Sequence, residues 1–143
     1  MSLSHPTQDK GDAGMAFVIA ALTTSGIKIA LPISEHLPFD LIAISNDGEL
    51  RKVSVKYRSA RDGKIEILLR SKWTASGGTK QRRWKKGEVD VHAVYCPDTS
   101  ACYFVPDADV RKATITLRLT PPKVHRKDTM LAATYADPTV MFT

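Results

Sequence analysis

The chain has few of the residues and patterns that mark several large functional classes. It contains only two cysteines, Cys96 and Cys102, and no histidine lies at a zinc-finger spacing from them, so we expect reduced thiols. No hydrophobic run is long enough to span a membrane and no secretory signal is visible, which predicts a soluble cytoplasmic protein. H-x-N-x-H, G-x-S-x-G and P-loop patterns are also missing, which argues against HNH chemistry, serine hydrolysis and NTP hydrolysis.

Acidic residues are scarce in the middle of the chain. Of 21 Lys and Arg residues, 13 lie between Arg51 and Lys86, where the only acids are Asp62 and Glu66. This segment carries a net charge of +11, whereas the rest of the chain carries −5. Such a split predicts a surface that binds the phosphate backbone of nucleic acid. The segment contains no basic amphipathic helix, which would favour a membrane surface instead.

Length and hydrophobic periodicity predict one domain that mixes helix and strand. A chain of 143 residues can bury a core without disulfides. We expect residues 10–143 to form this domain and residues 1–9 to be a flexible N-terminus. The expected elements are a helix at 12–25 with Asp12 as its N-cap and Gly26 at its end, strands at 27–31, 38–45, 50–57, 64–70, 89–95, 102–105 and 113–119, a mobile loop or β-ribbon in the basic stretch up to 87, a turn or short helix at 107–112, and a short C-terminal helix at 128–136.

A tight turn at residues 46–48 is expected to bring an acid and a lysine together. The turn ends in Asp-Gly, a strong hairpin signal, between two runs rich in Ile, Leu and Val. Strand alternation in the second run places Ser54 and Lys56 on the face opposite to the valines beside them. An antiparallel pair would then put Asp40 within about one strand step, roughly 3.3 Å, of the Ser54–Lys56 level.

An acid and a lysine at this distance can carry out metal-dependent phosphodiester chemistry. The Asp40 carboxylate can hold Mg²⁺, which takes oxygen ligands and keeps waters for hydrolysis. Lys56 can stabilise the charge on the phosphate or orient the attacking water. The alternative is that each is a solvated strand residue, and for the nearby His36 we expect a loop or packing role.

Five short segments between residues 10 and 106 follow a recognisable order. They are Lys10-Gly11-Asp12, Pro38-Phe39-Asp40-Leu41, Val53-Ser54-Val55-Lys56-Tyr57-Arg58, Leu69-Arg70-Ser71 and the run from Val89 to Asp98. An opening KGD helix, a P-x-D strand and a strand that ends in a lysine resemble the PD-(D/E)XK nuclease superfamily. The chain is most similar to its group I intron-associated, or homing, endonucleases.

The resemblance implies both a fold and an activity. The fold would be α/β (α+β), a restriction-endonuclease-like core of a mixed β-sheet with flanking helices. The activity would be Mg²⁺-dependent hydrolysis of double-stranded DNA at specific sites, leaving a 5′-phosphate and a 3′-hydroxyl. Cutting both strands would need two sites, hence a homo-oligomer such as a dimer or tetramer. Two alternatives stay open: a Holliday-junction resolvase with the same core, and a catalytically degenerate DNA-binding protein of the same fold.

The resemblance also assigns roles to single residues. It implies catalytic positions at Asp40, Lys56, Ser54 and Met15. The metal ligands would be Asp40 and the backbone carbonyl of Val55. Asp12, one helical turn before Met15 and on its face, is the third ligand we assign, and Glu35 in the loop before Pro38 is the alternative to it. The family usually has a carboxylate at the position of Met15 and an acid or glutamine at that of Ser54, so both residues depart from its pattern.

Contacts to DNA are expected from the basic middle of the chain. The residues assigned to this role are Arg58, Arg61, Lys80, Arg82, Arg83, Lys85 and Lys86. Two arginines in the densest run, Arg82 and Arg83, can read guanine edges in the major groove, whereas the lysines suit phosphates. Trp73 and Trp84 flank this run, and we expect both to anchor it to the core rather than to stack on bases.

Overall fold

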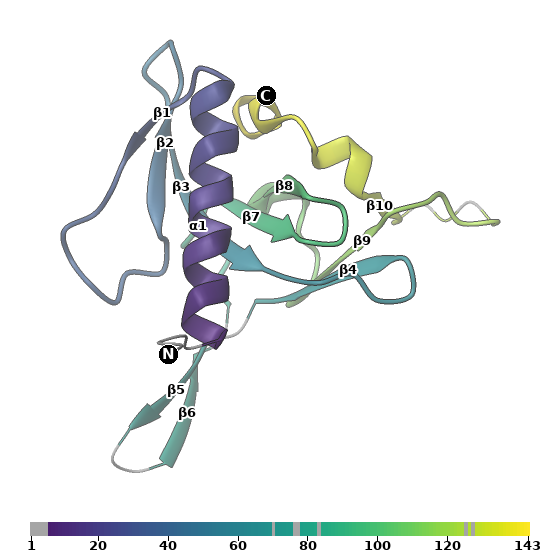
Figure 1. The fold of residues 1–143 in the computed structure, drawn as a ribbon, viewed down its shortest axis with the longest axis horizontal. Coiled ribbons are helices and arrows are strands. Elements are labelled where there is room, and N and C mark those ends of the chain that lie inside the picture. Colours follow the sequence, from purple (N-terminus) through teal and green to yellow (C-terminus); the bar gives the residue numbers. More distant parts are fainter. Residues whose placement is uncertain (1–5, 70, 76–77, 83, 125, 127) are drawn as a thin grey trace, which may run out of the picture.

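The fold combines one long helix with three β-sheets (Figure 1). The computed structural model describes residues 6–69, 71–75, 78–82, 84–124, 126 and 128–143. Helix α1 (Pro6–Thr24) is the only α-helix among them, and three short 3-10 helices follow later in the chain. None of the helices in these ranges is long and apolar enough to cross a membrane.

Helix α1 starts earlier than the sequence predicts. It begins at Pro6, whose fixed φ suits the first helical position, so Asp12 lies inside the helix and the predicted N-cap at Asp12 is wrong. Residues 6–9 are helical as well, while residues 1–5 of the predicted flexible N-terminus lie outside the described residues. The first two turns are exposed, which is why they show no apolar period. The predicted end is confirmed: Gly26 adopts a φ of +79° and Ile27 N–H donates to the Leu22 carbonyl.

The central sheet is mixed, as predicted. Its strand order is β1-β2-β3-β7-β8, with β3 and β7 parallel and the other neighbours antiparallel. The strands are β1 (Lys28–Ala30), β2 (Leu41–Ile44), β3 (Leu50–Tyr57), β7 (Val91–Cys96) and β8 (Ala101–Pro106). The β2–β3 hairpin turns at Gly48, which has a φ of +84°, so the Asp-Gly turn is confirmed.

Two smaller sheets complete the architecture. A three-stranded sheet has the order β10-β9-β4, and β5 pairs with β6 in a ribbon that extends away from the other elements in Figure 1. This ribbon confirms one of the two forms predicted for the basic stretch. The strands are β4 (Lys64–Leu68), β9 (Thr114–Arg118), β10 (Met130–Leu131), β5 (Ser71–Ala75) and β6 (Gly78–Arg82).

The 3-10 helices are η1 (Asp107–Asp109), η2 (Ala132–Tyr135) and η3 (Pro138–Phe142). The short helix expected at 107–112 is therefore present in part. The C-terminal helix expected at 128–136 is wrong, because Met130 and Leu131 pair in parallel with β9 before η2 begins. That pairing buries Ala132 and Tyr135 against the core, which a solvent-facing helix would not do.

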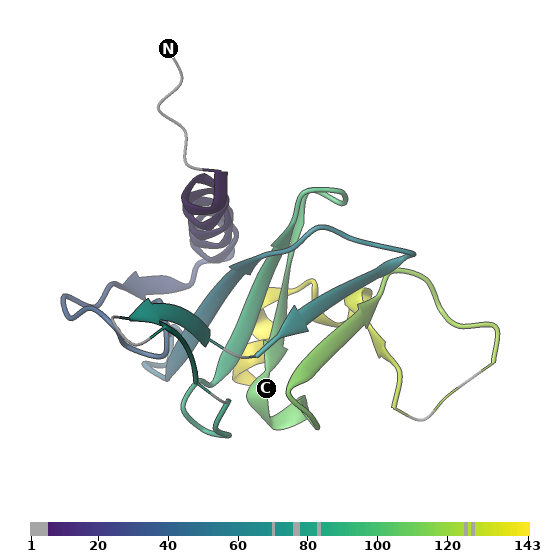
Figure 2. The same cartoon turned by 90° about the horizontal axis from the view of Figure 1, so that it is seen from below.

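Two apolar clusters lie on opposite faces of β3 and β7. On one face, Val53, Val91 and Ala93 pack with Val18 and Leu22 of α1. On the other face, Val94 and Cys96 belong to a cluster that includes residues of β4, β9 and η2. Figures 1 and 2 show α1 on one side of the central strands and β4 with β9 on the other. The side chains of β3 and β7 that point away from α1 are therefore buried only where the sheet of β4 and β9 packs against them.

Candidate active site

The Asp40 carboxylate is bound to the edge of β3 at the point where β2 has not yet begun. Its Oδ2 accepts a hydrogen bond of 2.7 Å from the Val55 N–H, and the Asp40 N–H donates to the Val53 carbonyl over 2.9 Å. Because β2 starts at Leu41, Val55 has no strand residue opposite on this edge. The carboxylate takes the place of the missing carbonyl, so its position is fixed although the residue is exposed.

Lys56 lies beside this carboxylate on a half-buried part of β3. Burial lowers the pKa of Lys56 below its usual range, and Arg58 lowers it further, whereas the charge of Asp40 raises it. Asp40 is hydrogen-bonded to Val55, the residue before Lys56 in β3, so the acid and the lysine come from neighbouring positions of the sheet. Lys56 makes no hydrogen bond to another described residue, which leaves its ammonium available to a ligand.

The residues at this corner fit a hard cation with few protein ligands. Oδ2 of Asp40 is engaged by Val55, while no contact of Oδ1 is found among the described residues. The Val55 carbonyl points to the same edge of β3 as its N–H, and hence toward Asp40. One carboxylate and one carbonyl suit Mg²⁺, which keeps several waters, and no cluster of three His, Cys, Asp or Glu side chains in the described ranges offers a fuller set.

The other residues assigned to the site are placed less favourably. Met15 is half-buried and packs against the apolar cluster between α1 and the sheet. Asp12 is exposed on α1 and makes no hydrogen bond or ion pair with any described residue. Gly14 is buried where α1 packs on β3, next to Tyr57 and the Lys56 carbonyl. Ser54 lies on the same face of β3 as Lys56, directly opposite His92 of β7.

Sequence reasoning missed a buried pair, His92 and Asp107, on the Ser54–Lys56 face. The His92 Nε2 lies 2.8 Å from Asp107 Oδ1, and both side chains are almost completely buried. Burial lowers the pKa of His92, which the Asp107 carboxylate raises in part and Lys56 lowers further. The signal in the sequence was a histidine within the apolar run Val91–Cys96, at a position that alternates to the same face as Val94.

Asp107 also ties the basic segment to the sheet. Its Oδ1 accepts a hydrogen bond from the Trp84 indole N–H over 3.0 Å, and its Oδ2 accepts one from the Gly87 N–H over 3.0 Å. Trp84 is half-buried against the core cluster, so its predicted anchoring role is confirmed. The side chain of Trp73 lies outside the described residues.

The basic residues assigned to DNA fall into three groups. Lys85, Lys86 and Arg61 are exposed, and Arg58 is half-buried next to Lys56. The backbone of Lys80 and Arg82 belongs to β6, but their side chains lie outside the described residues, as does the whole of Arg83. After the ribbon, Trp84 and Gly87 fix the chain to Asp107 before β7 begins.

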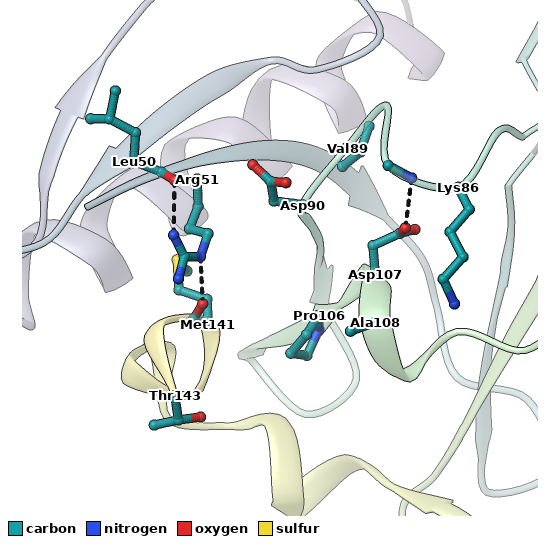
Figure 3. Close-up of a pocket in the computed structure, with 11 residues that line it drawn as sticks. Leu50, Arg51, Lys86, Val89, Asp90, Pro106, Asp107, Ala108, Met141 and Thr143 are labelled. Carbon is teal, nitrogen blue, oxygen red and sulfur yellow. Dashed lines mark hydrogen bonds between the residues drawn. The ribbon is translucent and has the colours of Figure 1, made fainter.

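An open pocket of about 450 Å³ lies at the other end of β3 (Figure 3). Arg51 and Asp90 line it from the sheet and Asp107 from η1, and the Arg51 guanidinium donates to the Met141 carbonyl over 2.9 Å. Figure 3 shows the Gly87–Asp107 hydrogen bond at its rim. Asp40 and Lys56 do not line this pocket.

Comparisons with known proteins agree with this geometry. A sequence model described as PD-(D/E)XK endonuclease matches residues 5–137. Among solved structures, the bacterial homing endonuclease I-Ssp6803I is similar, with a TM-score of 0.71 and 17% identity over 96% of this chain and 93% of that chain. At this identity the likeness shows the fold alone, which confirms the predicted restriction-endonuclease-like core. A search among curated proteins gave no match.

Proposed function

Because the chain belongs to the PD-(D/E)XK endonuclease family, we propose that it is a Mg²⁺-dependent endonuclease that cuts duplex DNA at specific sites, as a homing endonuclease does. The observation that carries this proposal is the corner of β3, where a fixed carboxylate and a half-buried lysine share one exposed edge. The fold likeness to a bacterial homing endonuclease supports the site-specific form of the activity.

The Asp40 carboxylate and the Val55 carbonyl would hold the metal. Mg²⁺ bound there would supply Lewis acidity to the scissile phosphate and activate water for attack on phosphorus. The hydrogen bond from Val55 N–H fixes the carboxylate before substrate arrives, so little reorganisation is needed when DNA binds. Asp12, exposed on α1, would be the third ligand of the assigned set.

Lys56 would stabilise the negative charge that develops on the phosphate. Its ammonium has no hydrogen bond to a described residue, and the charge of Asp40 favours its protonated form.

The basic segment would hold the DNA. Exposed Lys85 and Lys86 follow the β5–β6 ribbon, which has the size of a two-stranded element that enters a major groove. We assign phosphate contacts to these lysines, to Arg61 and to Lys80, and base contacts to Arg82 and Arg83. Cleavage of both strands would use two copies, so we also propose a homo-oligomer, a dimer or tetramer, acting in the cytoplasm.

One observation favours a second candidate, a DNA-binding protein without catalysis. Met15 packs into the apolar cluster where the family usually has a carboxylate, and Ser54 offers a hydroxyl where the family has an acid or glutamine. A chain with only one carboxylate at the corner could bind DNA through the basic segment and leave it uncut.

A plasmid assay separates the two candidates. The protein is incubated with supercoiled plasmid in Mg²⁺ or in EDTA, beside the variants Asp40→Ala and Lys56→Ala, and a four-way junction serves as a second substrate. Metal-dependent nicking or linearisation that both variants lose supports the nuclease. Retarded but uncut DNA under every condition means either the binding protein or an enzyme whose rare target the plasmid lacks. Preferential cutting of the junction would replace the homing assignment by a resolvase.

A further inference from the structure

His92 occupies the strand next to the candidate active site and faces the same way as its residues. In the parallel pair of β3 and β7, Ser54 lies directly opposite His92, and Lys56 lies opposite Val94. His92 is only 4% exposed, and Lys56 is its diagonal neighbour on the same face of the two strands. Paired residues on one face of a sheet have Cβ atoms about 5 Å apart, within reach of a short polar contact.

Asp107 holds the imidazole in one orientation. Its Oδ1 lies 2.8 Å from Nε2 of His92, and the carboxylate is itself fixed by Trp84 and Gly87. Burial lowers the pKa of His92, which favours the neutral ring at neutral pH. A neutral ring that serves a carboxylate carries its one proton on Nε2, so Nδ1 is left with a lone pair.

That lone pair has no partner. Nδ1 of His92 is the one fully buried side-chain nitrogen or oxygen in the described ranges that lacks a hydrogen bond. An unpaired buried acceptor is unfavourable, and such atoms in native proteins call for an explanation. The nearest hydroxyl by strand register is that of Ser54, which makes no hydrogen bond to a described residue.

We propose that His92 is a positioning residue of the active site, which accepts a hydrogen bond at Nδ1 from the Ser54 hydroxyl when DNA is bound. The proposal rests on the nuclease function proposed above. The chain from Asp107 through His92 to Ser54 orients the Ser54 oxygen beside Lys56, so that its lone pairs face the site. A neighbouring strand thereby supplies the orientation that an acid or glutamine at position 54 would supply by itself.

Two substitutions separate this role from a purely structural one. His92→Asn keeps a polar atom near the position of Nδ1, whereas His92→Gln keeps one near Nε2 and can still bind Asp107. We expect His92→Gln to lower the single-turnover cleavage rate about tenfold and His92→Asn to retain more of it, with DNA affinity in EDTA unchanged in both. The opposite order, full activity in His92→Gln and loss in His92→Asn, would mean that His92 only anchors Asp107 and would overturn the proposal.

A measurement that does not need cleavage completes the test. Nitrogen NMR of the imidazole, with uncut DNA bound in EDTA, should show the Nε2–H tautomer and a change of the Nδ1 resonance in Ser54→Ala. An Nδ1–H tautomer, or an Nδ1 resonance that Ser54→Ala leaves in place, would overturn the assignment. If the resonance changes as expected but the wild-type protein cuts no DNA in Mg²⁺, the nuclease function fails and the Ser54–His92 hydrogen bond stands.

Discussion

Strand β3 carries two corners that use the same local device on opposite edges. At one corner, Asp40 accepts a hydrogen bond from the Val55 N–H over 2.7 Å, with Lys56 next in the chain. At the other, Asp90 accepts one from the Lys52 N–H over 2.8 Å. In both cases an aspartate that precedes a neighbouring strand, β2 or β7, caps a backbone N–H that no strand residue would otherwise satisfy.

The two corners differ in whether the lysine of each forms a hydrogen bond. In both corners the aspartate N–H donates back to a carbonyl of β3, from Asp90 to Lys52 and from Asp40 to Val53. The difference is the lysine, because the Lys52 ammonium donates to the Gly87 carbonyl over 3.1 Å. The Lys56 ammonium makes no such bond in the described part of the chain, and Asp40 is exposed. An aspartate that caps a strand N–H therefore has a structural role when the nearby lysine is hydrogen-bonded. It becomes a candidate functional residue when the lysine and one carboxylate oxygen have no hydrogen bond to a described residue.

The sharpest test of this difference is to remove the charge of each aspartate. Asp40→Asn keeps an oxygen that can accept from Val55 N–H but loses the charge that holds a cation. We expect its single-turnover cleavage rate in Mg²⁺ to fall about 10³-fold or more, because a metal ion contributes several kcal/mol to transition-state stabilisation. Asp90→Asn is the matched control and should stay within about threefold of the wild type, since changes away from the reacting atoms leave transition-state stabilisation intact. Equal losses in the two variants would erase the distinction between the corners.

The second test replaces the lysine of each corner by methionine. Lys56→Met should lower the cleavage rate about 10²- to 10³-fold, as the loss of one preorganised charge donor does in other enzymes. Lys52→Met removes only the contact to Gly87, so its rate at saturating DNA should remain close to that of the wild type. Cleavage rates are measured with the protein in excess over a plasmid fragment that the wild type cuts. A Lys56→Met protein that cuts at the wild-type rate would show that the lysine is a solvated strand residue.

The first corner could be predicted from the sequence because its signals are local. Gly48 marks the turn, and strict alternation along β3 sets the faces, so the approach of Asp40 to Lys56 follows from strand geometry. The pair of His92 and Asp107 could not be predicted in this way, because fifteen residues and a strand reversal separate them. Only the tertiary arrangement brings together residues that no periodicity relates.

The predictions for the two ends of the chain were wrong for a different physical reason. The first turns of α1 are exposed and polar, so periodicity gave no helical signal before residue 12, although Pro6 at the first position is a recognised start. Near the C-terminus, the run from Met130 to Tyr135 has helical composition, but the edge of β9 was available and parallel pairing was favoured over propensity.

A third test concerns the basic stretch next to the closed corner. Lys85 and Lys86 directly precede Gly87, which accepts from Lys52 and donates to Asp107, and we propose that these two lysines hold DNA. The double substitution Lys85→Gln and Lys86→Gln should flatten the plot of log affinity against log salt by about two and leave the cleavage rate at saturating DNA unchanged. Lys28→Gln, an exposed lysine of β1 outside this stretch, is the control. An unchanged slope in the double variant would remove these lysines from the DNA surface.

The smallest expected effect is on stability, where the Asp90 corner should matter more than the Asp40 corner. Asp90→Ala leaves the Lys52 N–H without an acceptor in a half-buried place, which should lower the free energy of unfolding by about 1–3 kcal/mol. Asp40→Ala exposes the Val55 N–H to water, which can replace the carboxylate, so the loss should be under about 1 kcal/mol. Urea unfolding of both variants measures the difference. A larger loss of unfolding free energy in Asp40→Ala than in Asp90→Ala would show that Asp40 is kept for stability. That result would argue against a catalytic role, because removing a functional carboxylate is expected to reduce activity more than stability.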